Sequence, residues 1–441
     1  MVINSSYSIK LKDINKTLKP TIIIYREALK FILEVLILEY NPIKDLSSKK
    51  QINTVIFGCA YDINIIENLI HTTKKNIAKY KDFDTLFHKY PSYLRRSTIM
   101  DALGIYKSYS SNYENWELTK QGNPPKLNTT HNKFPCFLKP NMFLKTKNPY
   151  KIKLKIYKNN DWNWITISLR NKDVNYINKH CYSLKESNPT LEKRGKNFYL
   201  RFSYESKVII NKESNLVCAV DLGINTTATC CIMDSFGTVL ARKFIKCTRE
   251  EDQINHYLNK IKKHQRLGSK ENKTLWAKVN NFNKEISIKA TREIINFATT
   301  NKANVIVFEY LDTKGKIRCS KKQRLSLWRK RDIQNRVSHK AHLLGMRVNR
   351  VCAYNTSRLA FDGSGIVNRA FKNYSLCTFI TGKEYNSDLN ASYNIGARYY
   401  IKEIIKPFSE KKRLLMEAKV HSLSKRSTCT LSTLKELVSL V

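Results

Sequence analysis

A carboxylate at the end of a buried strand constrains the fold of this chain more than any other sequence feature. Residues 216–220 (LVCAV) form an apolar run that is typical of a strand covered on both faces. Asp221 ends that run, and a second apolar run at 227–233, a turn at 234–237 and a third strand at 238–245 follow. Because a buried carboxylate is costly unless a cation meets it, Asp221 predicts a place where positive charge is bound.

Two later acids stand in comparable positions. Residues 304–309 (NVIVFE) read as another buried strand that ends in Glu309, and Asp388 begins a predicted helix. Such acids can converge on divalent metal, and two Mg²⁺ ions about 3.5–4 Å apart supply what phosphodiester hydrolysis needs. Mg²⁺ prefers hard oxygen ligands of this kind, and Mn²⁺ is an alternative. We therefore predict that Asp221, Glu309 and Asp388 are metal ligands and catalytic residues.

Each acid alone also has an ordinary structural explanation, because an Asp close to a Gly, Asp221 included, usually marks a turn. Other chemistries find little support, since the sequence has no GxxxxGK[ST] phosphate loop and no GxSxG nucleophile elbow. His339 and His342 share one face of a predicted helix, but no acid or Cys completes a metal set there. We interpret them as structural or phosphate-contacting residues. Asn390 is a weaker candidate for a hydrogen bond to a ligand.

Four segments carry a resemblance to a known family: DLGINTTAT at 221–229, VIVFEYLD at 305–312, KAHLLGMRVNRVCAYNTSR at 340–358 and SDLNASYNIGAR at 387–398. They resemble the RuvC-like core of TnpB/OrfB proteins, which insertion sequences encode and which are related to the small type V CRISPR nucleases. The resemblance covers the C-terminal half well. The N-terminal half matches weakly, mainly at 91–109 and 112–126.

The resemblance implies an RNA-guided DNA endonuclease of an insertion sequence, in which a guide RNA selects the target by base pairing and Mg²⁺ assists hydrolysis. It implies an α/β plus α+β fold, with a RuvC/RNase H-like nuclease lobe after an N-terminal oligonucleotide-binding β-barrel. A separate transposase would then be a partner, since no tyrosine-transposase core is visible. The alternatives are a nucleic-acid-binding repressor that does not cleave, and an inactive relic of the same family.

The predicted domains follow from this division. Residues 1–214 would hold the barrel, formed by about 1–18 and about 130–214, with a helical recognition insert at about 19–129. Period-two alternation supports the strands of the barrel, and helical spacing of apolar residues supports the insert. Residues 215–441 would hold the RuvC-like nuclease domain.

The charge of the chain predicts a polyanionic partner. Its formal net charge is +43, from 79 Lys and Arg against 36 Asp and Glu. An AT-rich genome would explain the many Lys residues but not the shortage of acids, so we expect guide RNA and target DNA to bind here. The 11 Cys residues include no CxxC pair, and no signal peptide or long apolar span is evident. These patterns favour reduced thiols and a cytoplasmic protein without a membrane partner.

Basic and aromatic side chains in two regions are predicted to contact nucleic acid. The first region is the helical segment 91–109, for which plain bundle packing is the alternative, and the second is the basic run at 314–331. The candidates are Arg95, Arg96, Tyr106, Lys107, Lys321, Lys322, Arg324 and Arg331. Three further aromatic residues fit base stacking and barrel core equally well: Trp162, Trp164 and Phe198.

The sequence departs from the resembling family at the zinc ribbon, which relatives usually carry between the second and third acids. Two pairs of Cys are expected there, yet the segment at about 352–384 offers only Cys352 and Cys377. Two ligands cannot close a tetrahedral zinc site. We therefore expect a degenerate, ribbon-like insert without structural zinc, held by apolar residues such as Phe361, Ile366, Phe371, Tyr374 and Phe379.

Overall fold

The computed structural model divides the chain into two compact units, Val2–Ser206 and Lys207–Val441, which are described separately here. The structure describes residues 2–12, 14, 16–39, 60–210, 215–269, 271–310, 327–369 and 375–441, and at 60–62 the backbone alone. Several predicted residues lie outside these ranges: Lys321, Lys322, Arg324, Phe371 and Tyr374.

A five-stranded sheet forms the centre of the C-terminal unit, in the order β10-β9-β8-β11-β12. Strands β8, β9 and β10 are antiparallel neighbours, whereas β8, β11 and β12 run parallel. Their bounds are β8 Val217–Asp221, β9 Ala228–Met233, β10 Val239–Ile245, β11 Val305–Tyr310 and β12 Arg347–Cys352. The α/β character predicted for this half is confirmed.

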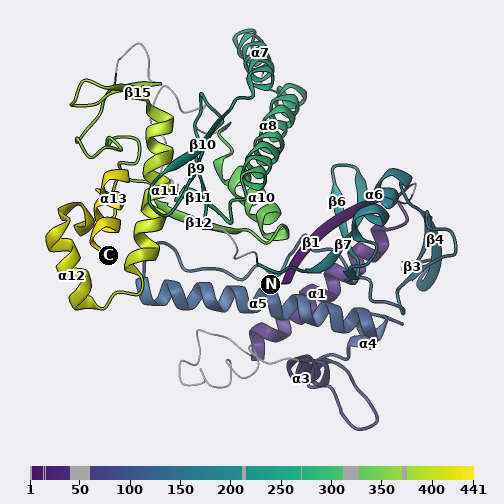
Figure 1. The fold of residues 1–441 in the computed structure, drawn as a ribbon. Coiled ribbons are helices and arrows are strands. Elements are labelled where there is room, and N and C mark those ends of the chain that lie inside the picture. Colours follow the sequence, from purple (N-terminus) through teal and green to yellow (C-terminus); the bar gives the residue numbers. More distant parts are fainter. Residues whose placement is uncertain are drawn as a thin grey trace. The chain divides into compact units, whose positions relative to one another are not determined.

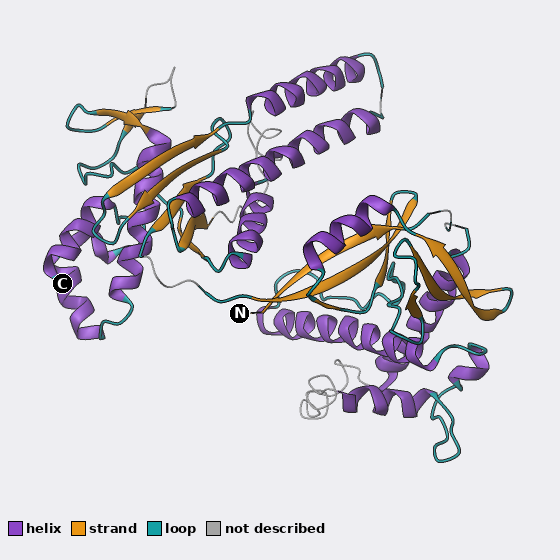
Figure 2. Ribbon diagram, turned by 45° about the vertical axis from the view of Figure 1, so that its right-hand side comes forward, coloured by secondary structure: helices purple, strands orange, loops and turns teal. Residues whose placement is uncertain are grey.

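Helices cover both faces of this sheet (Figures 1 and 2). On one face lie α8 (Lys273–Thr300) and α10 (Lys330–Leu343), and on the other lies α11 (Ser387–Ile405). Successive side chains of a strand point to opposite faces, so the even-numbered residues of β8 meet α8 and α10, and the odd-numbered ones meet α11. Helix α7 (Thr248–Arg266) precedes α8 in the chain and packs against it.

The C-terminal tail completes the core on the α11 side of the sheet. It forms α12 (Glu410–Lys419), the 3-10 turn η2 (His421–Ser424) and α13 (Leu431–Leu440). Three leucines of α13 are buried in the core that it shares with α11: Leu431, Leu434 and Leu437. The β9–β10 turn leaves room for this helix at Gly237, where φ is +81° and a Cβ would lie 2.9 Å from Leu431 Cδ1.

A small antiparallel sheet forms the ribbon-like insert, from β13 (Asn368–Arg369), β14 (Leu376–Thr378) and β15 (Glu384–Asn386). Its core consists of Ala360, Val367, Cys377 and Phe379, with Phe361 and Tyr385 packed against them. The contacts predicted for Phe361 and Phe379 are confirmed. The contact predicted for Ile366 is wrong, because its neighbour Val367 takes the inward position and leaves Ile366 56% exposed.

The N-terminal unit contains two small sheets, one in the order β1-β7-β5 with β6 also paired to β7, and one in the order β2-β3-β4. Their bounds are β1 Val2–Lys10, β2 Phe143–Lys145, β3 Lys151–Lys158, β4 Asp161–Ser168, β5 Lys185–Glu186, β6 Thr190–Arg194 and β7 Asn197–Lys207. An antiparallel bridge between Leu11 and Leu169 joins the ends of β1 and β4. Closure of these strands into an oligonucleotide-binding barrel stays a prediction.

Helices pack with both small sheets around one continuous hydrophobic core. They are α1 Lys19–Glu39, α3 Ala60–Ile70, α4 Phe83–Leu86, α5 Ser92–Thr119 and α6 Asn171–Cys181. Trp162 and Phe198 belong to this core, whereas Trp164 is 40% exposed. Of the helices that the structure describes, none has the length and apolar character needed to cross a membrane.

Candidate active site

Two of the predicted acids lie at the ends of adjacent parallel strands, on the same face of the sheet. Val220 pairs with Phe308, so Asp221 on β8 and Glu309 on β11 follow at the same level. Both are odd-numbered, and the alternation of side chains therefore gives them the face that α11 covers. Neighbouring strands lie about 4.8 Å apart, so main-chain pairing alone brings these two residues together.

Asp388 reaches the same face from the first turn of α11. Asn386 caps this helix, because its Oδ1 accepts hydrogen bonds of 3.0 Å from the backbone N–H groups of Asp388 and Leu389. The helix packs directly on β8 and β9. Burial raises the pKa of Asp221 well above its usual range, and the negative charges of Glu309 and Asp388 raise it further. The three predicted acids are thus close enough for their charges to interact.

Arg369 is a cation near these acids. The charge of Arg369, on β13, opposes the rise in the pKa of Asp221. The guanidinium is positioned by the backbone, since its Nη2 donates a hydrogen bond of 2.8 Å to the Ser357 carbonyl oxygen. The ribbon-like insert therefore contributes positive charge to a site that is otherwise acidic. Sequence reasoning missed Arg369 because a single Arg on a two-residue strand has no spacing pattern.

Hydrogen bonds hold Glu309 in place. Its carboxylate accepts a hydrogen bond from the Thr356 hydroxyl, and its backbone oxygen accepts one of 3.0 Å from Gln334 Nε2. Glu309 is 8% exposed, and burial raises its pKa, whereas the Thr356 hydrogen bond and the charge of Arg398 lower it. Supporting contacts of this kind orient a carboxylate for a ligand.

A buried hydroxyl faces the same region. Thr229 on β9 pairs with Asp221 in the antiparallel ladder, so the two side chains share a face of the sheet. Thr229 is 1% exposed, and its hydroxyl has no hydrogen-bond partner among the residues described. Buried polar groups are almost always paired, so this hydroxyl calls for a partner such as a water or a phosphate oxygen. Sequence reasoning did not single out Thr229.

The donor types at this site suit Mg²⁺. Three carboxylates and a hydroxyl are hard oxygen donors, which Mg²⁺ prefers. As the side chains stand, no three His, Cys, Asp or Glu residues within the described ranges are gathered closely enough to hold a metal ion. The chemistry of the donors therefore fits the ion, and metal binding by Asp221, Glu309 and Asp388 stays a prediction.

Asn390, two residues after Asp388 on α11, hydrogen-bonds to the backbone. Its Oδ1 accepts a hydrogen bond from the Phe361 N–H and its Nδ2 donates one to the Leu359 carbonyl oxygen, both at 2.8 Å. The side chain is fully buried. The structure thus assigns Asn390 to holding the 359–361 loop, rather than to the ligand contact that the sequence suggested.

Arg398 joins several segments near the acids through hydrogen bonds. The side chain is buried, at 4% exposure, and burial lowers the pKa of its guanidinium. It donates four hydrogen bonds to backbone carbonyl oxygens: Cys352 (2.7 Å), Tyr354 (2.8 Å), Ser427 (2.8 Å) and Cys429 (2.9 Å). One guanidinium therefore joins α11 to the end of β12 and to the tail before α13.

The residues predicted to bind nucleic acid divide into buried and exposed groups. Arg95 and Tyr106 are 5% and 1% exposed, so their predicted place on an outer surface is wrong. Their helix, α5, packs against α1 and α3, and this packing turns their side of the helix inward. Arg96, Lys107 and Arg331 are exposed, and for them nucleic-acid contact stays a prediction.

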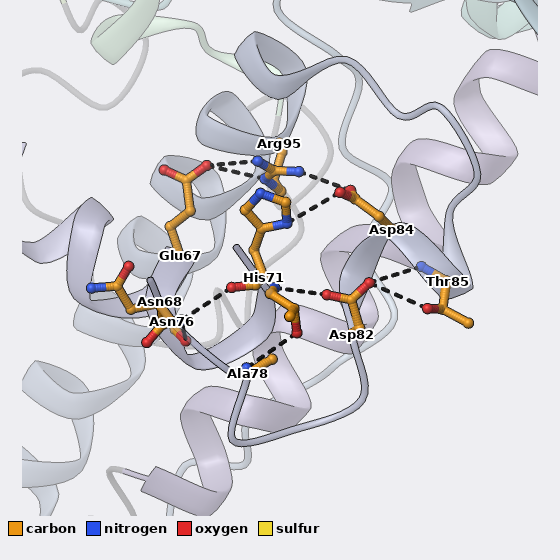
Figure 3. A network of polar contacts seen from close by, with 10 residues as sticks. Glu67, Asn68, His71, Asn76, Ala78, Asp82, Asp84, Thr85 and Arg95 are labelled. Atoms are coloured by element: carbon orange, nitrogen blue, oxygen red, sulfur yellow. Dashed lines mark hydrogen bonds and ion pairs between the residues drawn. The ribbon is translucent and has the colours of Figure 1, made fainter. Parts of the chain in front are cut away.

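Arg95 connects two acids in an ion-pair network (Figure 3). Its Nε and Nη2 donate to Glu67 Oε1 at 3.1 and 3.0 Å, and its Nη1 donates to Asp84 Oδ1 at 2.9 Å. The second carboxylate oxygen of Asp84 lies 3.1 Å from His71 Nδ1. Two acids thus pair with the guanidinium inside the N-terminal unit. This pairing explains why the guanidinium is not on the surface, where a phosphate could bind it.

We expect Arg95→Met to lower the free energy of unfolding of the N-terminal unit by about 3 kcal/mol, because Glu67 and Asp84 lose their buried partner. Arg96→Met is the matched control: Arg96 pairs with the same Glu67 at 3.1 Å but is exposed, so its loss should cost less than about 1 kcal/mol. Urea unfolding followed by circular dichroism measures both changes. Equal losses for the two variants would contradict the structural role of Arg95.

The ribbon-like insert should contain no zinc. Cys377 is buried in the apolar core of the insert, and its Sγ donates a hydrogen bond of 3.3 Å to the Tyr385 carbonyl oxygen. A structural zinc site needs four ligands, and Cys352 and Cys377 supply two. We expect metal analysis of the purified protein to find far less than one zinc per chain, with no change in Cys377→Ser. One zinc per chain that resists a mild chelator would contradict this prediction.

Sequence comparisons relate the chain to known proteins. Residues 5–158 match the Aq_aa04 family. The chain is also 28% identical over 229 residues to the TnpB-like protein aq_aa05 of Aquifex aeolicus (strain VF5), a match that covers 46% of this chain and 74% of that protein. The resemblance to TnpB proteins that the sequence motifs carry is thereby confirmed.

Solved structures of nucleases resemble the chain as well. The mini-RNA-guided endonuclease CRISPR-Cas_phi3 matches with a TM-score of 0.50 at 12% identity, over 90% of this chain and 92% of that one. At this level the match shows a shared fold. A Cas12f1-sgRNA-target DNA complex matches over 89% of this chain and 99% of that one at 17% identity, with a TM-score of 0.34 that adds nothing to this conclusion.

Proposed function

Because the chain is a relative of TnpB-like proteins, we propose that it is an RNA-guided DNA endonuclease encoded by an insertion sequence. The observation that supports this proposal most directly is the position of Asp221, Glu309 and Asp388 on one face of an α/β sheet. Three acids at neighbouring strand ends and a helix start form the kind of oxygen-rich site that phosphodiester hydrolysis requires.

The proposed mechanism gives each side chain a role. Asp221 would hold both of two Mg²⁺ ions, and Glu309 and Asp388 would each complete one. The bound ions supply charge neutralisation at the scissile phosphate and activation of the attacking water. Thr229 would donate its unpaired hydroxyl to a phosphate oxygen or a water, and Arg369 would attract the phosphate backbone into the site.

Guide RNA and target DNA are the proposed partners. The net charge of +43 supports a polyanionic partner, and exposed cations such as Arg96, Lys107 and Arg331 supply contacts to phosphates. In this proposal the protein works in the cytoplasm, and a separate transposase carries out strand transfer. The N-terminal strands would form the barrel, and the helices at about 19–129 its recognition insert.

Purification from cells tests this proposal. We expect the protein to copurify with one defined RNA, from the end of its own transcript, and to lose affinity steeply as salt rises because counterions are released from the phosphates. Sequencing of the bound RNA and filter binding at several salt concentrations measure these two properties. Recovery of only heterogeneous RNA would favour a general nucleic-acid-binding protein instead.

A repressor that binds without cleaving is the second candidate. The ribbon-like insert lacks the two pairs of Cys expected from the resembling family, and this departure favours it. Cleavage of guide-matched DNA in the presence of Mg²⁺ separates the two candidates. A protein that binds its RNA and target tightly but leaves the DNA intact would be the repressor.

A further inference from the structure

A cavity of about 680 Å³ opens at the β12 edge of the sheet in the C-terminal unit. Strand β12, α11, α12 and the segment that follows η2 line it. Its volume lies within the range of roughly 300–1,000 Å³ that is usual for ligand sites. Apolar side chains from β12, α11, the link between α11 and α12, and η2 form much of the lining: Val351, Ile401, Ile405, Phe408 and Leu423.

Cations surround this apolar surface. Arg350, Lys406 and Arg426 line the cavity, are exposed, and form no ion pair within the part of the chain that is described. Arg413 also lines it and pairs with Glu417 at 3.0 Å, and Glu417 is the one acid in the described lining. An apolar cavity with a cationic mouth fits a ligand that has a flat apolar part and a negative part.

We propose that this cavity takes one unstacked nucleotide of a single-stranded nucleic acid, with the base inside and phosphates on the cations at the mouth. Bases that leave a stack are commonly held by aromatic and apolar side chains, here Phe408 and Tyr310. The Nζ of Lys412 lies 4.3 Å from the centre of the Phe408 ring, which adds a further cation beside the aromatic surface.

The spacing of the cations favours a strand over a free nucleotide. Arg350 lies on β12, Lys406 at the end of α11, Arg413 on α12 and Arg426 beyond η2. Charges from four separate elements suit successive phosphates along a backbone, whereas one free phosphate would need a single convergent cluster.

The cavity adjoins the acids without including them. Tyr310, in its wall, directly follows Glu309 on β11, and Val351 pairs with Glu309 in the parallel ladder, so the cavity reaches the strand that carries Glu309. A nucleic-acid strand held here would pass beside the candidate active site. The inference goes beyond the proposed function, because it holds whether or not the acids cleave DNA.

Photocrosslinking of the full-length protein to an oligouridylate that carries 4-thiouridine tests this inference. Mass-spectrometric mapping should place the crosslink on Tyr310 or Phe408. Ile405→Trp fills the cavity without changing charge, and it should reduce this crosslink by about tenfold, the scale of one lost stacking contact. Arg426→Glu should weaken binding by a similar factor, whereas Lys435→Glu, an exposed cation on α13 outside the lining, should change it by less than about twofold.

Thermal unfolding of each variant verifies that it is folded before crosslinking. Crosslinks that map outside the cavity would overturn the inference, and so would full crosslink yield in folded Ile405→Trp. Free 4-thiouridine monophosphate is the second arm of the experiment. If it crosslinks to the cavity as efficiently as the strand does, the site takes free nucleotides, and the proposed strand-binding role is wrong.

Discussion

Asp221→Ala should abolish guided DNA cleavage and leave nucleic-acid binding intact. Asp221 ends the central strand of the sheet, and its carboxyl group interacts with the charges of both Glu309 and Asp388. Removing one member of a set of catalytic residues that acts as a unit typically costs on the order of 10³-fold or more in rate. Single-turnover cleavage in Mg²⁺ measures the rate, and filter binding of guide RNA measures the affinity.

Glu384→Gln is the matched control for this experiment. Glu384 is an exposed acid on β15 of the ribbon-like insert, and its substitution also removes one negative charge. We expect its cleavage rate to stay within about twofold of the unsubstituted protein, since exposed charges contribute little. Cleavage by Asp221→Ala at the rate of this control would show that the three acids are not the catalytic set.

Arg398→Met should destabilise the C-terminal unit more than any exposed substitution in it. The change leaves four backbone carbonyl oxygens without their donor, and each unsatisfied buried group costs about 1–3 kcal/mol. The expected loss in the free energy of unfolding is therefore at least about 4 kcal/mol. Urea unfolding followed by the fluorescence of the tryptophans in this unit measures it.

Arg413→Met provides the comparison, because Arg413 is exposed and pairs with Glu417 in the same helix. An exposed ion pair of this type contributes less than about 1 kcal/mol. If Arg398→Met lowered the free energy of unfolding by no more than Arg413→Met does, other donors would have to satisfy the carbonyl oxygens that Arg398 contacts. The proposal that Arg398 stabilises the contacts between these segments would then be wrong.

The strand-end acids were predictable because their signal is local. Apolar runs such as 217–220 and 305–308 predict buried strands, and an acid directly after each run falls at the strand end. Side-chain alternation then fixes the face. Alternation within one strand does not predict which residues of other elements lie beside the acids. Thr229 reaches the site through strand pairing, and Arg369 reaches it through the fold of the insert.

The error at Arg95 has a different cause. Helical spacing in 91–109 indicates that α5 has an inner and an outer side, but a helix rich in both basic and aromatic residues does not reveal which is which. Glu67 on α3 and Asp84 on α4 determine that the Arg95 side of α5 faces inward, because both acids pair with its buried guanidinium. Their distance in sequence from Arg95 hides this pairing from any reading of α5 alone.

The position of α13 has a consequence for the order in which the protein becomes complete during synthesis. Strand β8 begins at Val217, yet the core on its α11 side is closed by leucines of Leu431–Leu440. The N-terminal unit, Val2–Ser206, consists of earlier residues and can fold while translation continues. Contacts between residues so far apart in sequence also form slowly. The N-terminal unit can therefore be complete before the sheet that carries the acids is closed.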